Sequence, residues 1–237
     1  MPEQSKTVDA ALTLLTLLAD QDGESSAASL ARALGMSRTA VARMLATLES
    51  HGLARRTDRG WRPGLGLLAL ASGIEPQLRA LARTELEALA SRFGETAVLT
   101  VRDGDEAVAV EQVVGGAGVV QIHYRTGTRH PVDVTASGRA LLPGAGTGAV
   151  FSAGELEPGV RGVAAPVVGA EGRAVASVAL VAPEHRFPAD DAAAAAVADA
   201  ARRISLALAG DVPVRRPAAP APPSPPGGRD AVLPAGR

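Results

Sequence analysis

The sequence contains no cysteine and very few aromatic residues, and each scarcity excludes a kind of site or a kind of hydrophobic core. Without cysteine the chain has no disulfide, no thiolate nucleophile and no cysteine-ligated zinc site. Aromatic residues make up only 2% although 46% of residues are hydrophobic, so a core must be built from Ala, Val and Leu. No apolar run approaches the roughly 20 residues that a membrane-spanning helix needs, and the N-terminus lacks the basic leader of a signal peptide. We therefore expect a cytoplasmic protein without a membrane partner.

Positive charge is carried almost entirely by arginine, since Lys6 is the sole lysine. The formal net charge of −1 at pH 7 conceals an uneven distribution. Residues 30–62 hold seven arginines against Glu49 and Asp58, a local net charge of +5, whereas residues 1–29 have a net charge of −4. Basic residues concentrated in one small region are the electrostatic footprint of a surface that binds phosphates.

Residues 4–64 have the pattern of a winged helix-turn-helix. Apolar residues recur at helical spacing over 8–19. Ser26 and Ser37 are then placed to cap two further helices, with Gly35 breaking the pattern between them. A helix, a glycine-containing turn and a second helix form the helix-turn-helix motif.

A hairpin follows directly. Residues 53–56 and 61–63 are predicted strands, and the turn at 57–60 contains Asp-Arg-Gly. A hairpin in this position is the wing of such a domain, and its arginines are placed to meet the DNA backbone or minor groove.

Reading the major groove requires side chains at the start of the second helix of the motif. Arg38 and Arg43 can each hold a guanine edge or a phosphate, and the sequence leaves these two roles open. Ser37 and Thr39 suit a phosphate, and Ala40 offers a methyl contact to thymine. The alternatives are a plain helix cap for Ser37 and a solvated surface for the arginines. The predicted DNA-binding residues are Ser26, Ser37, Arg38, Thr39, Ala40, Arg43, Arg55, Arg56, Arg59 and Arg62.

Residues 65–210 predict a second domain of α+β class. The patterns indicate helices at 65–71, 75–92, 135–142 and 190–209, and strands at 96–101, 107–114, 119–124, 162–168 and 174–181. Residues 211–237 are mostly Pro, Ala and Gly, a composition typical of a disordered tail.

Three stretches together resemble the IclR type of bacterial transcription regulators. They are GMSRTAVARMLATLESHGLARRTDRGWRPGLGLLAL in the first domain, and TASGRALL (135–142) and GVRGVAAPVVGAEGRAVASVALVAP (159–183) in the second. The resemblance covers about residues 5–210, and the order of the three stretches makes it specific.

The resemblance implies a homodimer or tetramer that binds a palindromic operator in double-stranded DNA. It also implies that the second domain is a GAF-like sensor for a small organic acid or aromatic metabolite. The spacing of His and carboxylate residues indicates no metal site, and we expect no cofactor. Several positions that are polar in the family's pocket are small and apolar here, among them Gly162, Ala179 and Val181. The implied effector-binding residues are Val119, Ile122, His130, Ala136, Ser137, Gly162 and Ala179.

One departure from the family concerns residues 143–158, which join its two sensor motifs almost directly. The family usually has a further, mainly helical segment here, whose absence leaves a sheet face exposed, covered by a partner or differently packed. An alternative is therefore a vestigial sensor that serves only DNA binding and dimerisation. The sequence leaves open whether binding represses or activates transcription.

Catalysis was weighed as a rival function. His123, His130, Asp133 and Ser137 lie close in sequence, but His123 falls on a predicted strand and His130 in a predicted loop. The Gly-x-Ser-x-Gly pattern of a nucleophile elbow does not occur. The glycine-rich 144–148 lacks the Lys-Ser/Thr pair of a phosphate-binding loop. We therefore expect no enzymatic activity.

Overall fold

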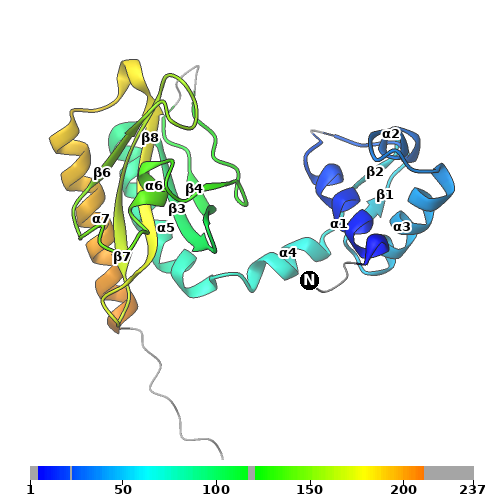
Figure 1. Ribbon diagram of the computed structural model, residues 1–237, viewed down its shortest axis with the longest axis horizontal. Coiled ribbons are helices and arrows are strands. Elements are labelled where there is room, and N and C mark those ends of the chain that lie inside the picture. The colour runs from blue at the N-terminus through cyan, green and yellow to red at the C-terminus, as the bar shows by residue number, and fades with distance from the viewer. Residues whose placement is uncertain (1–4, 22, 117–120, 211–237) are drawn as a thin grey trace, which may run out of the picture.

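The computed structural model describes residues 5–21, 23–116 and 121–210 (Figure 1). Two units, each with its own hydrophobic core, are joined by a helical connection. The first core lies within residues 14–61 and the main core of the second within 78–204. None of the helices in the described part of the chain combines the length and apolarity needed to span a bilayer.

The N-terminal unit consists of three helices and a two-stranded hairpin. These are α1 (Lys6–Ala19), α2 (Ala27–Ala33), α3 (Arg38–Ser50), β1 (Ala54–Arg56) and β2 (Trp61–Pro63). Leu14 and Leu18 of α1 are fully buried against Leu30 of α2 and Val41 and Leu45 of α3. The predicted winged helix-turn-helix is confirmed.

The connection between the units is formed by α4 (Gly66–Ser72) and the start of α5 (Pro76–Phe93). No residue of α4 is buried. Large hydrophobic side chains on and beside α4, among them Leu65, Leu68, Leu70 and Ile74, are exposed to solvent in the single chain.

The C-terminal unit is built on a six-stranded antiparallel sheet in the order β5-β4-β3-β8-β7-β6. Its elements are β3 (Thr96–Asp103), β4 (Glu106–Val113), β5 (Arg129–Pro131), α6 (Ala136–Arg139), β6 (Val150–Ala153), β7 (Val160–Val168), β8 (Ala174–Pro183), the 3-10 turn η1 (Glu184–Arg186) and α7 (Asp190–Gly210).

Different helices pack on the two faces of this sheet. Alternating side chains point to opposite faces of a strand, and Leu99 and Leu180 pack in the core that contains α5 and α7. Their neighbours Val98 and Ala179 instead pack against Ala136 of the short helix α6. The long helices thus cover one face, and α6 lies on the other. The α+β prediction is confirmed.

Several details of the predicted secondary structure were wrong. A strand was predicted over 119–124, but 121–124 form no strand, and 119–120 lie outside the described residues. Side chains hold this segment instead: Thr96 Oγ1 donates to the Ile122 carbonyl at 2.6 Å, and Gln112 Oε1 accepts from the Tyr124 N–H at 2.9 Å. The strand that pairs with the outer edge of β4 is β5, so His130 lies on a strand rather than in a loop.

Residues 143–158 are also more ordered than a simple joining loop. They contain β6, which pairs antiparallel with β7 at the edge of the sheet. The helix predicted over 135–142 is shorter, with α-helical residues only at 136–139.

Candidate DNA-binding surface and effector pocket

The start of α3 is set by a side-chain cap. Ser37 Oγ accepts the N–H of Ala40 at 3.2 Å, and Ser26 Oγ caps α2 in the same way by accepting the N–H of Ser29 at 3.0 Å. Such caps satisfy amides that have no partner within the helix. Both serines are exposed, so capping does not remove their hydroxyls from the surface.

One face of α3 is buried and the other is free. Val41, Leu45 and Leu48 point into the core of the N-terminal unit. Thr39 and Arg43 fall on the opposite face and are exposed, as is Arg38 at the first turn, while Ala40 is half-buried. This is the arrangement of a helix that can present its N-terminal side chains to a DNA groove.

The hairpin that forms the wing is stabilised by its turn and by backbone hydrogen bonds to the segment before α2. Thr57 Oγ1 accepts the N–H of Gly60 at 3.1 Å and so closes the turn between β1 and β2. Ser25 and Trp61 exchange two backbone hydrogen bonds, which tie the hairpin to the start of α2. A Cβ on Gly60 would lie 2.6 Å from the Ser25 carbonyl oxygen, so this close approach requires glycine.

Arg55 and Arg62 are direct cross-strand partners in this hairpin, and both are exposed. Like charges directly opposite each other on an antiparallel pair are destabilising. The nearby Glu49 does not offset them as an ion-pair partner; its Oε1 accepts the backbone N–H of Arg56 at 3.3 Å. A bound anion would relieve this repulsion.

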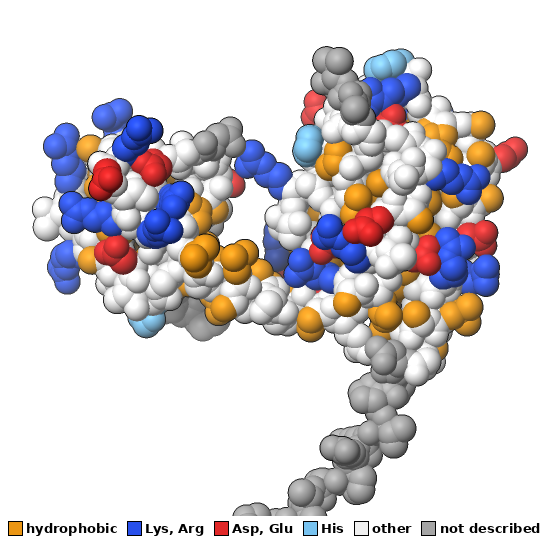
Figure 2. Space-filling model, turned by 180° about the vertical axis from the view of Figure 1, so that it is seen from behind, with side chains coloured by type: hydrophobic (Ala, Val, Ile, Leu, Met, Phe, Trp, Pro, Cys, Tyr) orange, Lys and Arg blue, Asp and Glu red, His pale blue; other side chains and the backbone are white. Residues whose placement is uncertain are grey.

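No arginine of the N-terminal unit forms an ion pair with any residue that the structure describes. In Figure 2, Lys and Arg side chains project from the surface of this unit, most of them away from the C-terminal unit. The arginines that the sequence placed at a DNA interface, namely Arg38, Arg43, Arg55, Arg56, Arg59 and Arg62, are all exposed.

A cavity of about 340 Å³ lies on the α6 side of the C-terminal sheet. Gly162 on β7 and Ala179 and Val181 on β8 contribute to its wall from the sheet. The other walls come from α6, from the irregular segment 121–128 and from the connection between β6 and β7. The volume is suited to a small organic molecule.

Five of the seven predicted effector residues line this cavity, namely Ile122, Ala136, Ser137, Gly162 and Ala179. His130 does not line it. Its ring is buried behind Thr135, with Nε2 3.4 Å from Thr135 Oγ1, and packs edge-on against Tyr124. Val119 lies outside the described residues.

Sequence reasoning missed the residues that the β6–β7 connection and the 121–128 segment bring to the cavity. Among them are Tyr124, Glu155 and Glu157. Val160, the first residue of β7, was missed as well. A signal was present in the sequence, because the apolar run Ala149–Phe151 between glycines is typical of a short strand.

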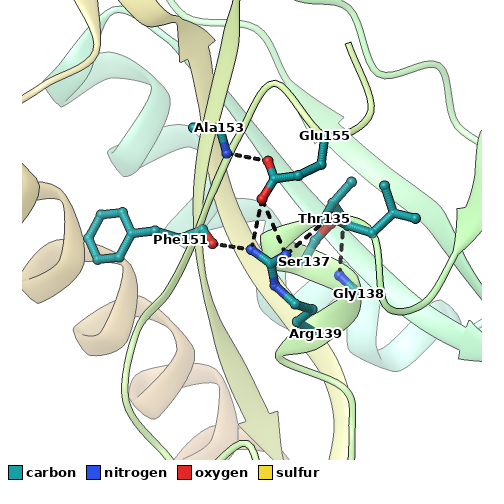
Figure 3. A network of polar contacts seen from close by, with 8 residues as sticks. Thr135, Ser137, Gly138, Arg139, Phe151, Ala153 and Glu155 are labelled. Carbon is teal, nitrogen blue, oxygen red and sulfur yellow. Dashed lines mark hydrogen bonds and ion pairs between the residues drawn. The ribbon is translucent and has the colours of Figure 1, made fainter. Parts of the chain in front are cut away.

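A polar network around α6 fixes the cavity's inner wall (Figure 3). Thr135 Oγ1 accepts the N–H of Gly138 at 3.2 Å and lies 2.9 Å from Ser137 Oγ. A Cβ on Gly138 would lie 2.2 Å from the Val132 carbonyl oxygen, so the tight packing of α6 requires glycine there.

Arg139 connects α6 to the edge of the sheet. Its guanidinium donates to the Phe151 carbonyl oxygen and forms an ion pair with Glu155 at 3.3 Å. The other oxygen of Glu155 accepts the N–H of Ala153 (Figure 3). These contacts hold β6 beside α6 without any intervening helix.

Two groups at the cavity have shifted pKa values. Burial raises the pKa of Tyr124 to about 12, so its phenol stays protonated at neutral pH. Partial burial alone would raise the pKa of Glu155. Hydrogen bonds from the backbone N–H groups of Glu155 and Ala153 and the Arg139 guanidinium outweigh it, so the net shift is downward and the carboxylate is charged.

A capped second helix and a basic wing, joined by a helical linker to an α+β domain, define the architecture of a DNA-binding transcription regulator. Family models agree. Residues 7–58 match the IclR helix-turn-helix domain, and residues 74–147 and 145–206 match the C-terminal domain of the bacterial transcriptional regulator IclR. The chain therefore belongs to the IclR family of transcription regulators.

Characterised relatives are similar over different lengths. The regulator XynR of Escherichia coli is 26% identical over 243 positions, covering 86% of this chain and 95% of XynR. The regulator KipR of Bacillus subtilis is 30% identical, covering 60% of this chain and 57% of KipR. The XynR alignment exceeds the 237 residues of this chain, so part of XynR faces gaps here. The C-terminal family model also matches in two pieces that meet at 145–147, in agreement with a shortened 143–158 segment.

Solved structures share the fold. An IclR regulator from Alicyclobacillus acidocaldarius aligns with a TM-score of 0.69 at 23% identity, covering 87% of this chain and all of that one. An IclR homologue from Microbacterium hydrocarbonoxydans, solved in complex with 4-hydroxybenzoate, aligns with a TM-score of 0.71 at 21% identity, covering 86% of this chain and 99% of that one.

Proposed function

We propose that α3 enters the major groove of a palindromic operator and that the wing contacts the adjacent backbone or minor groove. The observation that supports this most directly is a set of exposed arginines along α3 and the wing that make no ion pair with any described residue. Arg38 and Arg43 would read bases or hold phosphates from the first turns of α3. Ser26, Ser37 and Thr39 would contact phosphates, and Ala40 would meet a thymine methyl group.

The test is a fluorescence-anisotropy titration of the full chain with DNA fragments from its own upstream region. Affinity should fall steeply with salt, because each phosphate neutralised contributes a slope of roughly −0.9 to log K against log salt. A fragment that carries the operator should bind more tightly than a shuffled fragment at every salt concentration. Failure to bind any upstream fragment at low salt would refute the proposal.

We further propose that the protein acts as a homodimer, as two halves of a palindrome require two recognition helices. Exposed apolar side chains on α1 and α4 support a second copy as the occupant of this surface, with Val8 and Leu12 on α1 and Leu68 and Leu70 on α4. Figure 2 shows apolar side chains gathered at the connection between the units.

Light scattering with size-exclusion chromatography tests the dimer. The substitution Leu68→Glu with Leu70→Glu should yield monomers, and Leu206→Glu, at an exposed position on α7, should leave the dimer intact. A dimer that survives the α4 substitutions would place the interface elsewhere, and a tetramer in the parent protein would require a second interface.

We propose that the 340 Å³ cavity holds an effector that alters DNA binding. The bound 4-hydroxybenzoate of the Microbacterium relative supports a small aromatic ligand in a domain of this fold. Substituting Ala179→Leu would fill the cavity from the sheet and should abolish ligand-induced thermal stabilisation while DNA binding persists. If no small aromatic compound stabilises the parent protein, the alternative of a vestigial sensor is favoured.

Catalysis has little support in the geometry of the candidate residues. The Ser137 hydroxyl contacts Thr135 rather than a histidine, and His130 Nε2 also faces Thr135. A serine nucleophile needs a base within hydrogen-bond reach. We therefore propose a regulator without enzymatic activity that works in the cytoplasm, where it reaches chromosomal DNA.

A further inference from the structure

The effector cavity contains carboxylates but no cationic side chain. Glu155 and Glu157 line it, and no Lys or Arg does so among the residues that the structure describes. Residues 117–120, beside this segment in sequence, read Ala-Gly-Val-Val and contribute no charged side chain. The imidazole of His123 also lines the cavity, and a histidine carries no fixed positive charge.

The charges of the two carboxylates are not equally compensated. Arg139 forms an ion pair with Glu155 from outside the cavity lining, so that charge is largely offset. The side chain of Glu157 makes no hydrogen bond or ion pair with any described residue. Arg125 follows Tyr124 in the sequence but is not among the lining residues. Among the described residues the cavity therefore has one carboxylate without a partner, that of the exposed Glu157.

The remaining polar groups of the wall are neutral. The Tyr124 phenol and the hydroxyls of Ser137 and Ser152 can donate or accept hydrogen bonds. Ala179, Val181 and Val160 provide apolar surface for a ring or chain. Such a wall can orient a hydroxylated aromatic ligand, but it has no guanidinium or ammonium group to pair with a ligand carboxylate.

We propose that the effector of this protein is a cationic aromatic amine whose ammonium group faces Glu157, rather than an organic acid. The inference rests on the proposed role of the cavity as an effector site and names its ligand class. An anionic ligand would be repelled by Glu157 and would leave its carboxylate without a cationic partner, whereas an ammonium group would be attracted.

A series of three compounds with the same phenol ring tests the charge preference. Calorimetric titration of the full chain should show that 4-hydroxybenzylamine binds roughly two- to fivefold more tightly than 4-hydroxybenzyl alcohol, the range for an exposed ion pair, with 4-hydroxybenzoate weakest. The preference should shrink as salt rises, because Glu157 lies near solvent.

Two substitutions test whether Glu157 causes the preference for the amine. Glu157→Gln should remove most of the difference between amine and alcohol, and Glu157→Lys should reverse the order of amine and acid. The matched control is Glu24→Gln, at an exposed glutamate of the N-terminal unit, and it should change nothing.

The outcomes separate this inference from the effector proposal. Tightest binding of the acid, or equal binding of all three compounds, would overturn the amine assignment while leaving an effector cavity in place. If none of the three binds, the amine assignment is refuted, and the thermal-stabilisation test with Ala179→Leu then decides separately whether the cavity holds an effector.

Discussion

In the N-terminal unit the arginines face solvent without an acidic partner among the described residues, whereas in the C-terminal unit almost every arginine forms an ion pair with a carboxylate. The latter pairs join Arg79 and Arg83 to Glu111, Arg129 to Asp103 and Glu106, Arg139 to Glu155, Arg161 to Asp190, Arg186 to Glu95 and Arg203 to Glu85. Both units use arginine nearly exclusively as the cation. The two units differ in how many acidic side chains lie within ion-pair distance of their arginines.

The pairs of the C-terminal unit connect elements that are distant in sequence. Arg203 on α7 reaches Glu85 on α5, and Arg79 on α5 reaches Glu111 on β4. They therefore support the packing of the long helices on each other and on the sheet. Arginine in the C-terminal unit stabilises the fold, whereas the exposed arginines of the N-terminal unit make no ion pair with any residue that the structure describes.

The largest expected effect is a loss of stability when a buried carboxylate of the C-terminal unit loses its cation. The Glu95 side chain is only 6% exposed and contacts the Arg186 guanidinium at 2.6 Å. Breaking a buried pair leaves an uncompensated charge, so Arg186→Ala should lower the melting temperature by on the order of 10 °C. Calorimetry measures the melting temperature of the variant and of the parent protein.

The control for that variant is Arg202→Ala, which removes an exposed pair with Asp199 within α7. Exposed pairs contribute little, so its melting temperature should hardly change. Equal losses in both variants would show that burial does not decide the contribution of an ion pair in this unit.

The next effect is on DNA binding without a change in stability. Arg43→Ala should weaken operator binding by roughly 1–3 kcal/mol, the range for a bidentate base contact. Its melting temperature should match that of the parent protein, since Arg43 has no acidic partner among the described residues. An anisotropy titration that finds unchanged affinity would remove Arg43 from the interface.

A smaller effect separates the two roles of Ser37. Ser37→Ala should cost about 1 kcal/mol of stability because the amide of Ala40 loses its acceptor. Ser37→Asp keeps a capping oxygen and should retain stability, but its charge would repel a phosphate and weaken DNA binding. If Ser37→Asp binds DNA as tightly as the parent, Ser37 is a cap without a DNA contact.

The N-terminal unit was predicted in more detail than the C-terminal one. Its helices and hairpin are local structures whose caps and turns, such as Ser37 and Thr57–Gly60, are visible in a short window of sequence. The strands β5 and β6 were missed because each is only three or four residues long and depends on pairing with a distant neighbour.

The cavity was predicted only in part, because some of its residues reach it through pairing of segments that the sequence pattern does not show. Gly162 and Ala179 lie on long strands whose pattern is clear, and both line the cavity. Glu155 and Glu157 reach it only because β6 pairs with β7 and Arg139 fixes the following turn. A contact made through tertiary structure leaves no periodic signal in the sequence.

The smallest expected effect is a gain in stability at the cost of binding. Arg55 and Arg62 are opposite each other in the wing, and neither forms an ion pair with a described residue. Arg55→Gln should relieve the repulsion and stabilise the N-terminal unit by about 0.2–1 kcal/mol, while reducing the slope of log K against log salt by about 0.9. Chemical denaturation and a salt titration of the same variant measure the two changes. A variant that gains stability and keeps the full salt dependence would show that Arg55 does not contact a phosphate, and the contrast between the two units would then rest on α3 alone.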